Sequence, residues 1–246
     1  MTDKTSRVAI VTGAARGIGA AVAERLATDG FTVVINYSAG ARPAESLARE
    51  IEGKGGRALA FKADVADPGA VRGMFDAAEA AFGGVDVLVN NAGIMKLARI
   101  ADSDDALFDR QIAVNLKGSF NAMREAGKRL RDGGRIVNFS TSVVGTKLET
   151  YGVYAATKSA IETMTAIMSK EMRGRNITVN ALAPGPTSTE LFLEGKSPEL
   201  VERMAKMIPL ERLGTPEDIA AVVAFLVGPD GGWVNGQVLR ANGGMV

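Results

Sequence analysis

The chain reads Arg7-Val-Ala-Ile-Val-Thr-Gly13-Ala-Ala-Arg16-Gly17-Ile-Gly19 near its start, and this stretch decides the fold. An apolar run typical of a strand leads directly into glycines and then into a helical pattern. Glycines let the backbone turn tightly and approach a pyrophosphate, while a helix N-terminus offers free N–H groups and partial positive charge. The G-x₃-G-x-G spacing departs from the usual G-x-G-x-x-G fingerprint, and a tight turn without a ligand is the alternative. The strand–loop–helix order favours dinucleotide binding.

The composition of the chain restricts its chemistry. Its 246 residues are 46% hydrophobic, enough to bury a large α/β core, and a net charge of +1 gives no bulk attraction to nucleic acid or acidic membranes. Cysteine and histidine are both absent. Thiol catalysis and zinc alcohol dehydrogenase chemistry are therefore excluded, no metal site is expected, and proton transfer has to use other side chains. The polar residues 1–7 and the short apolar run after them predict neither a signal peptide nor a membrane span, and hence a cytoplasmic protein.

Short β-branched runs alternate with longer helical patterns, which is typical of βαβ units around a parallel sheet. Strands are predicted at 7–12, 31–36, 57–62, 85–90, 135–140, 178–183 and 237–240, and helices at 17–29, 43–53, 68–82, 105–131, 153–173 and 216–227. We expect a single-domain doubly wound (Rossmann) fold over residues 1–246, with a seven-stranded parallel sheet flanked by helices. The Pro- and Thr-rich stretch 184–209 breaks this rhythm, so residues 186–209 are predicted to be a substrate lid.

The end of the second predicted strand indicates which dinucleotide is bound. An acid that would bind a ribose 2′-hydroxyl is expected there, but the chain has Asn36, Tyr37 and Ser38. Arg16 lies in the glycine loop and Arg42 lies just beyond the strand. Two ordinary solvated arginines are one interpretation; a pocket for the 2′-phosphate of NADPH is the functional one.

A tyrosine and a lysine at the start of a predicted helix suggest acid–base chemistry. Tyr154 and Lys158 are four residues apart, which puts both side chains on one helix face. An ammonium group beside a phenol lowers the pKa of the phenol. Such a pair on a surface is common by chance, but Ser142 stands 12 residues earlier, just after a strand, where open α/β sheets bind ligands. A hydroxyl there can hydrogen-bond a substrate oxygen.

These motifs together resemble the short-chain dehydrogenase/reductase family. The likeness rests on the glycine loop Gly13–Gly19, on Asn90-Asn91-Ala92-Gly93, on Ser142 and on Tyr154-x₃-Lys158. It extends through Pro184-Gly185 to Asn235-Gly-Gln and Gly243-Gly244, and so over essentially the whole chain. Within the family the chain most resembles the NADPH-dependent 3-oxoacyl-[acyl-carrier-protein] reductase-like branch.

The resemblance implies a role for each matched catalytic residue. Tyr154 would protonate the carbonyl oxygen, Lys158 would lower the pKa of Tyr154 and hold the nicotinamide ribose, and Ser142 would orient the substrate oxygen. Asn115 would anchor a water that leads protons to Lys158; the other interpretation is a buried asparagine that satisfies the backbone, and in this family both can be true. The distance from Ser142 to Tyr154 is one residue shorter than the commonest spacing in the family, and Ser140 is a second candidate for the serine role.

The predicted cofactor contacts come from every part of the chain. They are Gly13, Ala15, Arg16, Gly17, Ile18 and Gly19 in the glycine loop, Asn36, Tyr37, Ser38 and Arg42 after the second strand, Asp64 and Val65 at the adenine, Asn91, Ala92 and Gly93 along the adenosine ribose, Tyr154 and Lys158, and Pro184, Gly185, Thr187 and Thr189 at the nicotinamide carboxamide.

The predicted substrate pocket is mostly apolar, which favours a hydrophobic ketone over a free sugar. Its residues are Met95, Ser142, Val143, Leu148, Tyr151, Tyr154, Leu191, Phe192 and Met207. The sequence therefore predicts NADPH-dependent reduction of a ketone or aldehyde, 3-oxoacyl thioesters included. An alcohol or sugar dehydrogenase and a non-catalytic NADP(H)-binding protein are the alternatives.

Two expectations concern partners. The resemblance implies a homotetramer formed through helices 153–173 and 105–131 and the C-terminal strand. Cationic residues at two predicted helix ends would fit an acidic acyl carrier protein, although cations there complement the helix dipole in any case. They are Lys128, Arg129, Arg131, Arg173 and Arg175.

Overall fold

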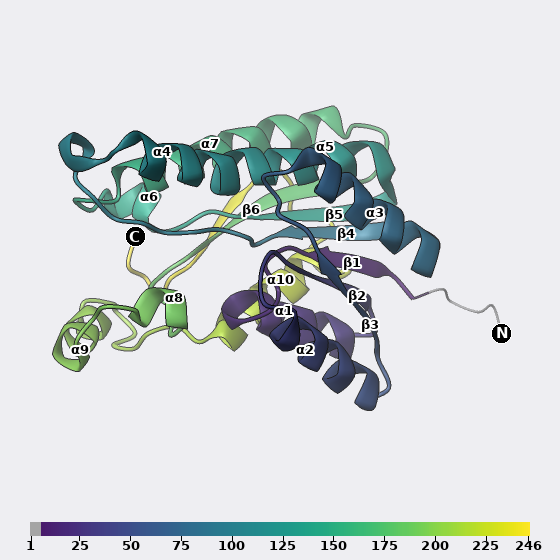
Figure 1. Ribbon diagram of the computed structural model, residues 1–246, viewed down its shortest axis with the longest axis horizontal. Coiled ribbons are helices and arrows are strands. Elements are labelled where there is room, and N and C mark those ends of the chain that lie inside the picture. The colour runs from purple at the N-terminus through teal and green to yellow at the C-terminus, as the bar shows by residue number, and fades with distance from the viewer. Residues whose placement is uncertain (1–5) are drawn as a thin grey trace.

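The computed structural model describes residues 6–246, so most of the polar start predicted at 1–7 lies outside the described residues. One seven-stranded sheet runs through the protein (Figure 1). Its strands are β1 (Val8–Val11), β2 (Thr32–Tyr37), β3 (Arg57–Lys62), β4 (Val85–Asn90), β5 (Leu130–Phe139), β6 (Thr178–Pro184) and β7 (Val238–Ala241). The strand order is β3-β2-β1-β4-β5-β6-β7, and all neighbouring strands are parallel. The predicted Rossmann architecture is confirmed.

The order of the strands places a ligand crevice between β1 and β4. From β1 the chain moves outward to β2 and β3, and it then returns to place β4 on the other side of β1. Open α/β sheets bind ligands at such a reversal, beyond the carboxyl ends of the strands. The glycine loop follows β1 and Asn91 follows β4, so both lie at this point.

Helices cover both faces of the sheet. They are α1 (Gly17–Thr28), α2 (Ala41–Gly53), α3 (Pro68–Phe82), α4 (Asp105–Gln111), α5 (Gly118–Arg129), α6 (Val143–Thr146), α7 (Gly152–Glu171), α8 (Glu190–Leu193), α9 (Pro198–Lys206) and α10 (Pro216–Val227), with the short turns η1 (Ile100–Asp102) and η2 (Ile112–Lys117). Figure 1 shows α1, α2 and α10 on one face and α3, α4, α5 and α7 on the other, with α8 and α9 projecting beyond the sheet. One hydrophobic cluster fills each side, centred on residues such as Leu26 and Leu226 on one and Phe75 and Ile161 on the other.

The long helix predicted at 105–131 is interrupted. It begins as α4, becomes a π-helical turn in η2 and resumes as α5, which ends at Arg129. Asn115 lies in the π-helical turn and is fully buried. Its side-chain Oδ1 accepts from the Ile94 N–H (2.8 Å) and its Nδ2 donates to the Ile94 carbonyl (2.9 Å). The turn therefore widens where the helix fastens the segment after β4, in keeping with the tendency of π-bulges to occur at functional sites.

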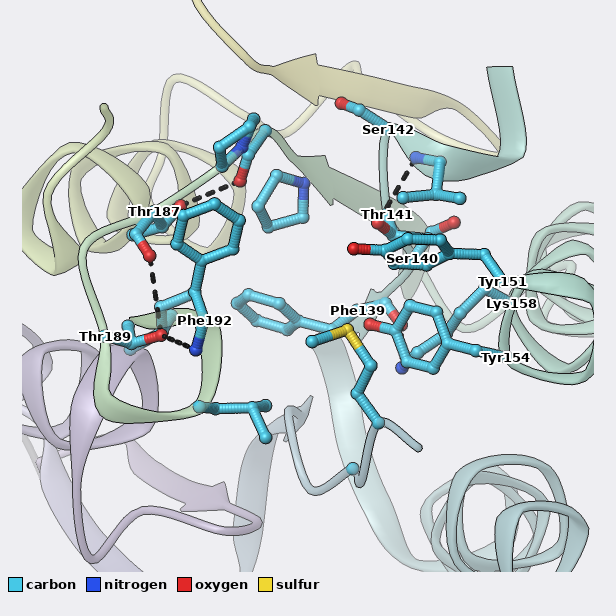
Figure 2. A pocket seen from close by; sticks show the side chains of 18 of the residues that line it. Phe139, Ser140, Thr141, Ser142, Tyr151, Tyr154, Lys158, Thr187, Thr189 and Phe192 are labelled. Atoms are coloured by element: carbon cyan, nitrogen blue, oxygen red, sulfur yellow. Dashed lines mark hydrogen bonds between the residues drawn. The ribbon is translucent and has the colours of Figure 1, made fainter. Parts of the chain in front are cut away.

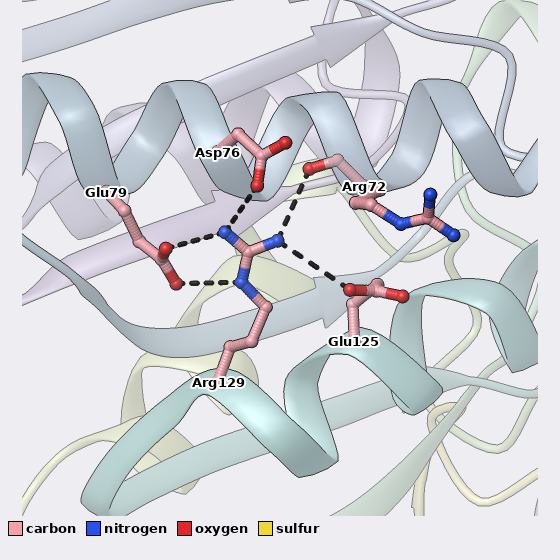
Figure 3. A network of polar contacts seen from close by, with 5 residues as sticks. All are labelled: Arg72, Asp76, Glu79, Glu125 and Arg129. Carbon is pink, nitrogen blue, oxygen red and sulfur yellow. Dashed lines mark hydrogen bonds and ion pairs between the residues drawn. The ribbon is translucent and has the colours of Figure 1, made fainter.

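A cationic side chain at the end of α5 joins this helix to α3 (Figure 3). The Arg129 guanidinium donates to both carboxylate oxygens of Glu79 (2.8 and 2.6 Å) and to Asp76 (2.7 Å), and it lies 3.6 Å from Glu125. The side chain of Arg129 is only 17% exposed. The predicted basic patch for an acidic partner therefore loses Arg129, which is occupied by three carboxylates of its own chain.

Two further members of that patch are also paired. Arg131 lies 3.2 Å from Asp86, and Arg175 lies 2.9 Å from Asp132. No helix in residues 6–246 is long and apolar enough to cross a membrane.

Candidate active site

The glycine loop after β1 is held in shape by polar side chains from neighbouring strands. The Thr12 hydroxyl accepts hydrogen bonds from the N–H groups of Asn91 (3.1 Å) and Ala92 (3.0 Å). The side-chain amide of Asn91 in turn donates to the carbonyls of Thr12 (2.9 Å) and Gly13 (3.0 Å). The ends of β1 and β4 are thus fastened together at the crevice.

The same loop can take this shape only because of its glycines. A Cβ on Gly13, whose φ is +63°, would come within 2.9 Å of the Ala92 backbone, and a Cβ on Gly19 would lie 2.5 Å from the Gly13 carbonyl oxygen. Gly17 also has a positive φ, +56°. No side chain caps the N-terminus of α1, so its first N–H groups face the loop. A cradle of this kind fits a dinucleotide pyrophosphate.

At the end of β2, one predicted residue is buried and supports the glycine loop, while the others are exposed or half-buried. Asn36 is buried, and its side chain accepts from the Gly13 N–H (3.1 Å) and donates to the Ala63 carbonyl (3.0 Å), so it supports the loop from below. Ser38 and Arg42 are exposed, and Tyr37 is half-buried. Arg16 is also exposed and lies 3.5 Å from Glu190 at the start of α8. The described residues place no carboxylate at the end of β2.

The predicted adenine residues follow β3. One carboxylate oxygen of Asp64 accepts from the Ala66 N–H (2.9 Å), while the other lies 3.3 Å from Arg110 of α4. Val65 is buried, and its carbonyl accepts from the Asn121 side chain (2.9 Å). Arg110 was not predicted, and nothing in the local sequence indicates that α4 reaches Asp64.

A cleft opens beside the glycine loop and contains eight of the nine predicted pocket residues (Figure 2). Its empty volume is about 960 Å³, including space open to solvent. Its other predicted residues are Ile18, Asn91, Gly93, Lys158, Pro184, Gly185, Thr187 and Thr189. Phe192 of α8 faces Tyr151 and Tyr154 across the cleft in Figure 2. Met207, in contrast, does not line the cleft and is largely exposed.

Tyr154 and Lys158 come together from consecutive turns of α7. The Lys158 ammonium nitrogen lies 5.9 Å from the centre of the Tyr154 ring, and it donates to the Phe139 carbonyl at 2.8 Å. Burial raises the pKa of Tyr154 to about 12, against a smaller lowering effect of the Thr141 side chain. Burial also lowers the pKa of Lys158 to about 8. The predicted lowering of the Tyr154 pKa by Lys158 is therefore wrong for this structure, because desolvation of the phenol dominates.

Three consecutive hydroxyl side chains follow β5. Ser140 donates to Glu162 (2.5 Å), and Ser142 donates to the Ala183 carbonyl (3.3 Å) while accepting from Asn242 (3.0 Å). Thr141 was not among the predicted site residues, although the short spacing from Ser142 to Tyr154 marked this stretch as unusual. All three line the cleft.

Comparison with known proteins agrees with this geometry. Residues 13–246 match a family described as enoyl-(acyl carrier protein) reductase. A short-chain type dehydrogenase/reductase of Picea abies is 48% identical over 98% of this chain and 92% of its own length. An NADPH-dependent aldehyde reductase-like chloroplastic protein of Arabidopsis thaliana is 47% identical over 98% of this chain and 94% of its own. A short-chain dehydrogenase of Burkholderia cenocepacia, solved in complex with NADP, is 37% identical with a TM-score of 0.93, covering 99% of both chains.

The chain belongs to the short-chain dehydrogenase/reductase family. It is accordingly an oxidoreductase that uses a nicotinamide dinucleotide to act on carbonyl or hydroxyl groups. The alternative of a non-catalytic binding protein is set aside. Neither curated relative named above is called a 3-oxoacyl reductase, so the predicted branch within the family gains no support from them.

The structure of this family member shows how Asn115 acts. Both polar atoms of its side chain are bonded to Ile94, which corresponds to the backbone-satisfying alternative considered for it. A Cβ on Gly93 would lie 3.3 Å from the Asn115 side-chain oxygen and 3.7 Å from the Lys158 nitrogen. Asn115 thus fixes the wall next to Lys158.

The C-terminal part of this dehydrogenase/reductase closes the other side of the cleft. The Thr187 hydroxyl donates to the Gly185 carbonyl (3.0 Å), and Thr189 caps α8 by accepting from the Phe192 N–H (3.2 Å; Figure 2). Met245 lines the cleft, and Asn242 donates to the Val246 carbonyl (3.1 Å) as well as to Ser142. These tail residues were not predicted, because only the fold brings the last residues back to the strand ends.

Proposed function

We propose that this protein reduces an apolar aldehyde or ketone to the alcohol with NADPH, and that Tyr154 donates the proton to the carbonyl oxygen. The observation that carries the proposal is the position of Tyr154, whose phenol lies in a mostly apolar cleft with the Lys158 nitrogen 5.9 Å from its ring centre. Burial raises the pKa of Tyr154, so the phenol holds its proton at neutral pH. A general acid has to be protonated before the reaction, whereas oxidation of an alcohol needs the phenolate.

The cofactor is NADPH. The glycine loop and the N-terminus of α1 would hold the pyrophosphate, and Arg16, Ser38 and Arg42 would surround the 2′-phosphate, since all three are exposed beside a strand end without an acid. The Arabidopsis relative is named NADPH-dependent and the Burkholderia structure contains NADP, which supports the same choice. When bound, the reduced nicotinamide supplies the hydride.

Lys158 is suited to return a proton to Tyr154. Its ammonium is buried and close to the phenol ring, and its pKa of about 8 puts proton release near neutral pH. A group with an ordinary lysine pKa would release a proton much less readily. The Phe139 carbonyl holds the Lys158 nitrogen in place at 2.8 Å. The Asn115 side chain holds Ile94 beside this pair through two hydrogen bonds.

An apolar substrate matches the walls of the cleft. Leu148, Tyr151, Leu191, Phe192 and Met204 all line it. A free sugar would leave several hydroxyl groups without partners against these side chains, and each unpaired polar group costs about 1–3 kcal/mol. We therefore place the sugar dehydrogenase alternative behind reduction of a hydrophobic carbonyl compound. The aldehyde reductase-like name of the Arabidopsis protein supports the same substrate class.

Residues 186–209 act as the lid over this cleft. They carry α8 and α9, and Leu191, Phe192 and Met204 contribute to the cleft wall.

The homotetramer stays part of the proposal. Its support is apolar surface on the outer helices, where Phe120 of α5 and Ile167 of α7 are exposed. A monomer at micromolar concentration in analytical sedimentation would contradict it. The cytoplasmic location stays a prediction. The Arabidopsis relative, in contrast, is named as chloroplastic.

A substrate panel tests the proposed function directly. NADPH oxidation is followed with an apolar aldehyde, an aryl ketone, a 3-oxoacyl thioester and a 2-enoyl thioester, and NADP+ reduction is followed with a free sugar. The aldehyde and the ketone should be reduced with the highest kcat/KM. The enoyl thioester is the matched control, because its reducible bond is C=C and Tyr154 has no carbonyl oxygen to protonate in the same way. Reduction of the enoyl thioester alone, or sugar oxidation faster than carbonyl reduction, would contradict the proposal.

A further inference from the structure

We propose that Thr141, and not Ser142, supplies the second hydroxyl that holds the substrate oxygen beside Tyr154. The inference rests on the carbonyl reduction proposed above and names a further residue of its active site. The assignment follows from the hydrogen-bond partners that each of the three hydroxyl groups after β5 has within the fold.

The protons of both serines are committed to the protein. A hydroxyl group has one proton to donate and two lone pairs to accept with. The Ser142 hydroxyl donates to the Ala183 carbonyl of β6 (3.3 Å) and accepts from the Asn242 side chain (3.0 Å). Ser142 is also only 3% exposed. The Ser140 hydroxyl donates to the Glu162 carboxylate at 2.5 Å. Neither can donate to a substrate without breaking a bond within the fold.

Thr141 has the opposite surroundings. Its hydroxyl oxygen accepts from the Val143 N–H (3.3 Å), it donates to no other group within residues 6–246, and Thr141 is partly exposed on the cleft wall. Figure 2 shows Thr141 above the two tyrosine rings, whereas the Ser142 hydroxyl points away from them.

A carbonyl oxygen in this place can use both groups at once. One lone pair takes the proton of Tyr154, and the other accepts a hydrogen bond from Thr141. Charge develops on this oxygen during reduction, so both bonds strengthen as the reaction proceeds. Threonine is stiff about its first side-chain torsion, and the bond from Val143 fixes it further. Thr141 is therefore oriented before the substrate arrives.

Substitutions at the two positions separate the roles. Thr141→Val keeps the shape and removes the hydroxyl; Thr141→Ser keeps the hydroxyl; Ser142→Ala removes the other candidate. Loss of one donor to a developing oxyanion lowers kcat by about 10²–10³-fold, so we expect this loss for Thr141→Val, with KM for NADPH unchanged. Thr141→Ser should restore kcat to within about tenfold of the parent, because the donor returns without its fixed torsion. Ser142→Ala should lower Tm and leave kcat within about tenfold of the parent, since it leaves one N–H of the Asn242 amide without its acceptor.

Two readouts make the outcome decisive. Far-ultraviolet circular dichroism and NADPH binding are measured for each variant, and Thr141→Ala replaces Thr141→Val if the latter does not fold. A kcat loss confined to Ser142→Ala, or the absence of any kcat loss in the Thr141 variants, would overturn the assignment. Tyr154→Phe is run in parallel. If it remains active, the proposed function has failed; if it is inactive while Thr141→Val is active, only the role of Thr141 has failed.

Discussion

The side-chain nitrogen of Lys158 lies 2.8 Å from the carbonyl oxygen of Phe139, in a place where water scarcely reaches it. Burial lowers the pKa of this lysine from 10.5 to about 8, so its charged form destabilises the folded state. The penalty is fully present below pH 8 and disappears as pH rises towards the unfolded value. The lowering corresponds to a free-energy difference on the order of 3 kcal/mol across that window.

We therefore expect the stability of the parent to rise with pH relative to Lys158→Met. Urea unfolding of both proteins at about pH 7 and about pH 9.5 measures the effect, which should be on the order of 2 kcal/mol. The comparison between two pH values cancels the loss of the bond to Phe139, which is common to both. A constant difference between the two proteins would show that Lys158 is not desolvated in this way.

Replacing Tyr154 by phenylalanine tests the proton donor. The change keeps the ring and its edge contact with Tyr151, whose ring centre is 6.4 Å away. General acid catalysis contributes about 10²–10⁴-fold, so kcat should fall by at least that lower figure while NADPH binding is retained. Tyr151→Phe is the matched control, because it removes a neighbouring phenol from the same cleft. A Tyr154→Phe enzyme within about threefold of the parent would refute the assignment of Tyr154 as the acid.

The features predicted correctly from the sequence depend on local patterns, and the features missed depend on contacts between residues far apart in the chain. The strands and the glycine loop were predicted because β-branched runs and glycine spacing are local properties, and α10 has the predicted limits 216–227. The π-helical turn at Asn115 was missed because it depends on bonds to Ile94, which a local pattern does not contain. Thr141 was missed for the same reason. The hydroxyl of Ser142 is turned away by Ala183 and Asn242, residues that only the folded sheet brings near it.

The carboxylates around Arg129 predict a role in stability. Arg129→Met would leave Glu79, Asp76 and the buried Glu125 without their cation, and we expect a destabilisation of about 2–3 kcal/mol, less than for a fully buried pair because Asp76 and Glu79 are partly exposed. The hydrogen bond from Arg129 holds the pKa of Glu79 below its usual range. The effect should therefore be present at neutral pH and be lost as pH falls below the ordinary glutamate pKa.

Lys128→Met is the control for this prediction, since Lys128 is exposed at the same helix end. It should change the free energy of unfolding by less than about 0.5 kcal/mol. If Arg129→Met unfolds at the same urea concentration as the parent, the network does not stabilise the contact of α3 with α5. If it is stable but loses activity only on carrier-bound substrates, the docking role set aside above has to be restored.

The contact between Arg16 and Glu190 leads to a prediction about cofactor choice. Arg16 of the glycine loop is exposed and lies 3.5 Å from Glu190 at the start of α8. The 2′-phosphate of NADPH carries close to two negative charges and would compete with this single carboxylate for the guanidinium. A charged hydrogen bond contributes about 1.5–3 kcal/mol, so Arg16→Ala should raise KM for NADPH by roughly 10- to 150-fold and scarcely change KM for NADH.

Glu190→Gln should act in the opposite direction and lower KM for NADPH by up to about fivefold, because an exposed ion pair contributes at most about 1 kcal/mol. Arg25→Ala, which removes an exposed arginine paired with Asp29 at the far end of α1, is the control and should leave both KM values unchanged. Equal kcat/KM for the two cofactors in the parent, or an equal loss of both in Arg16→Ala, would show that Arg16 does not read the 2′-phosphate.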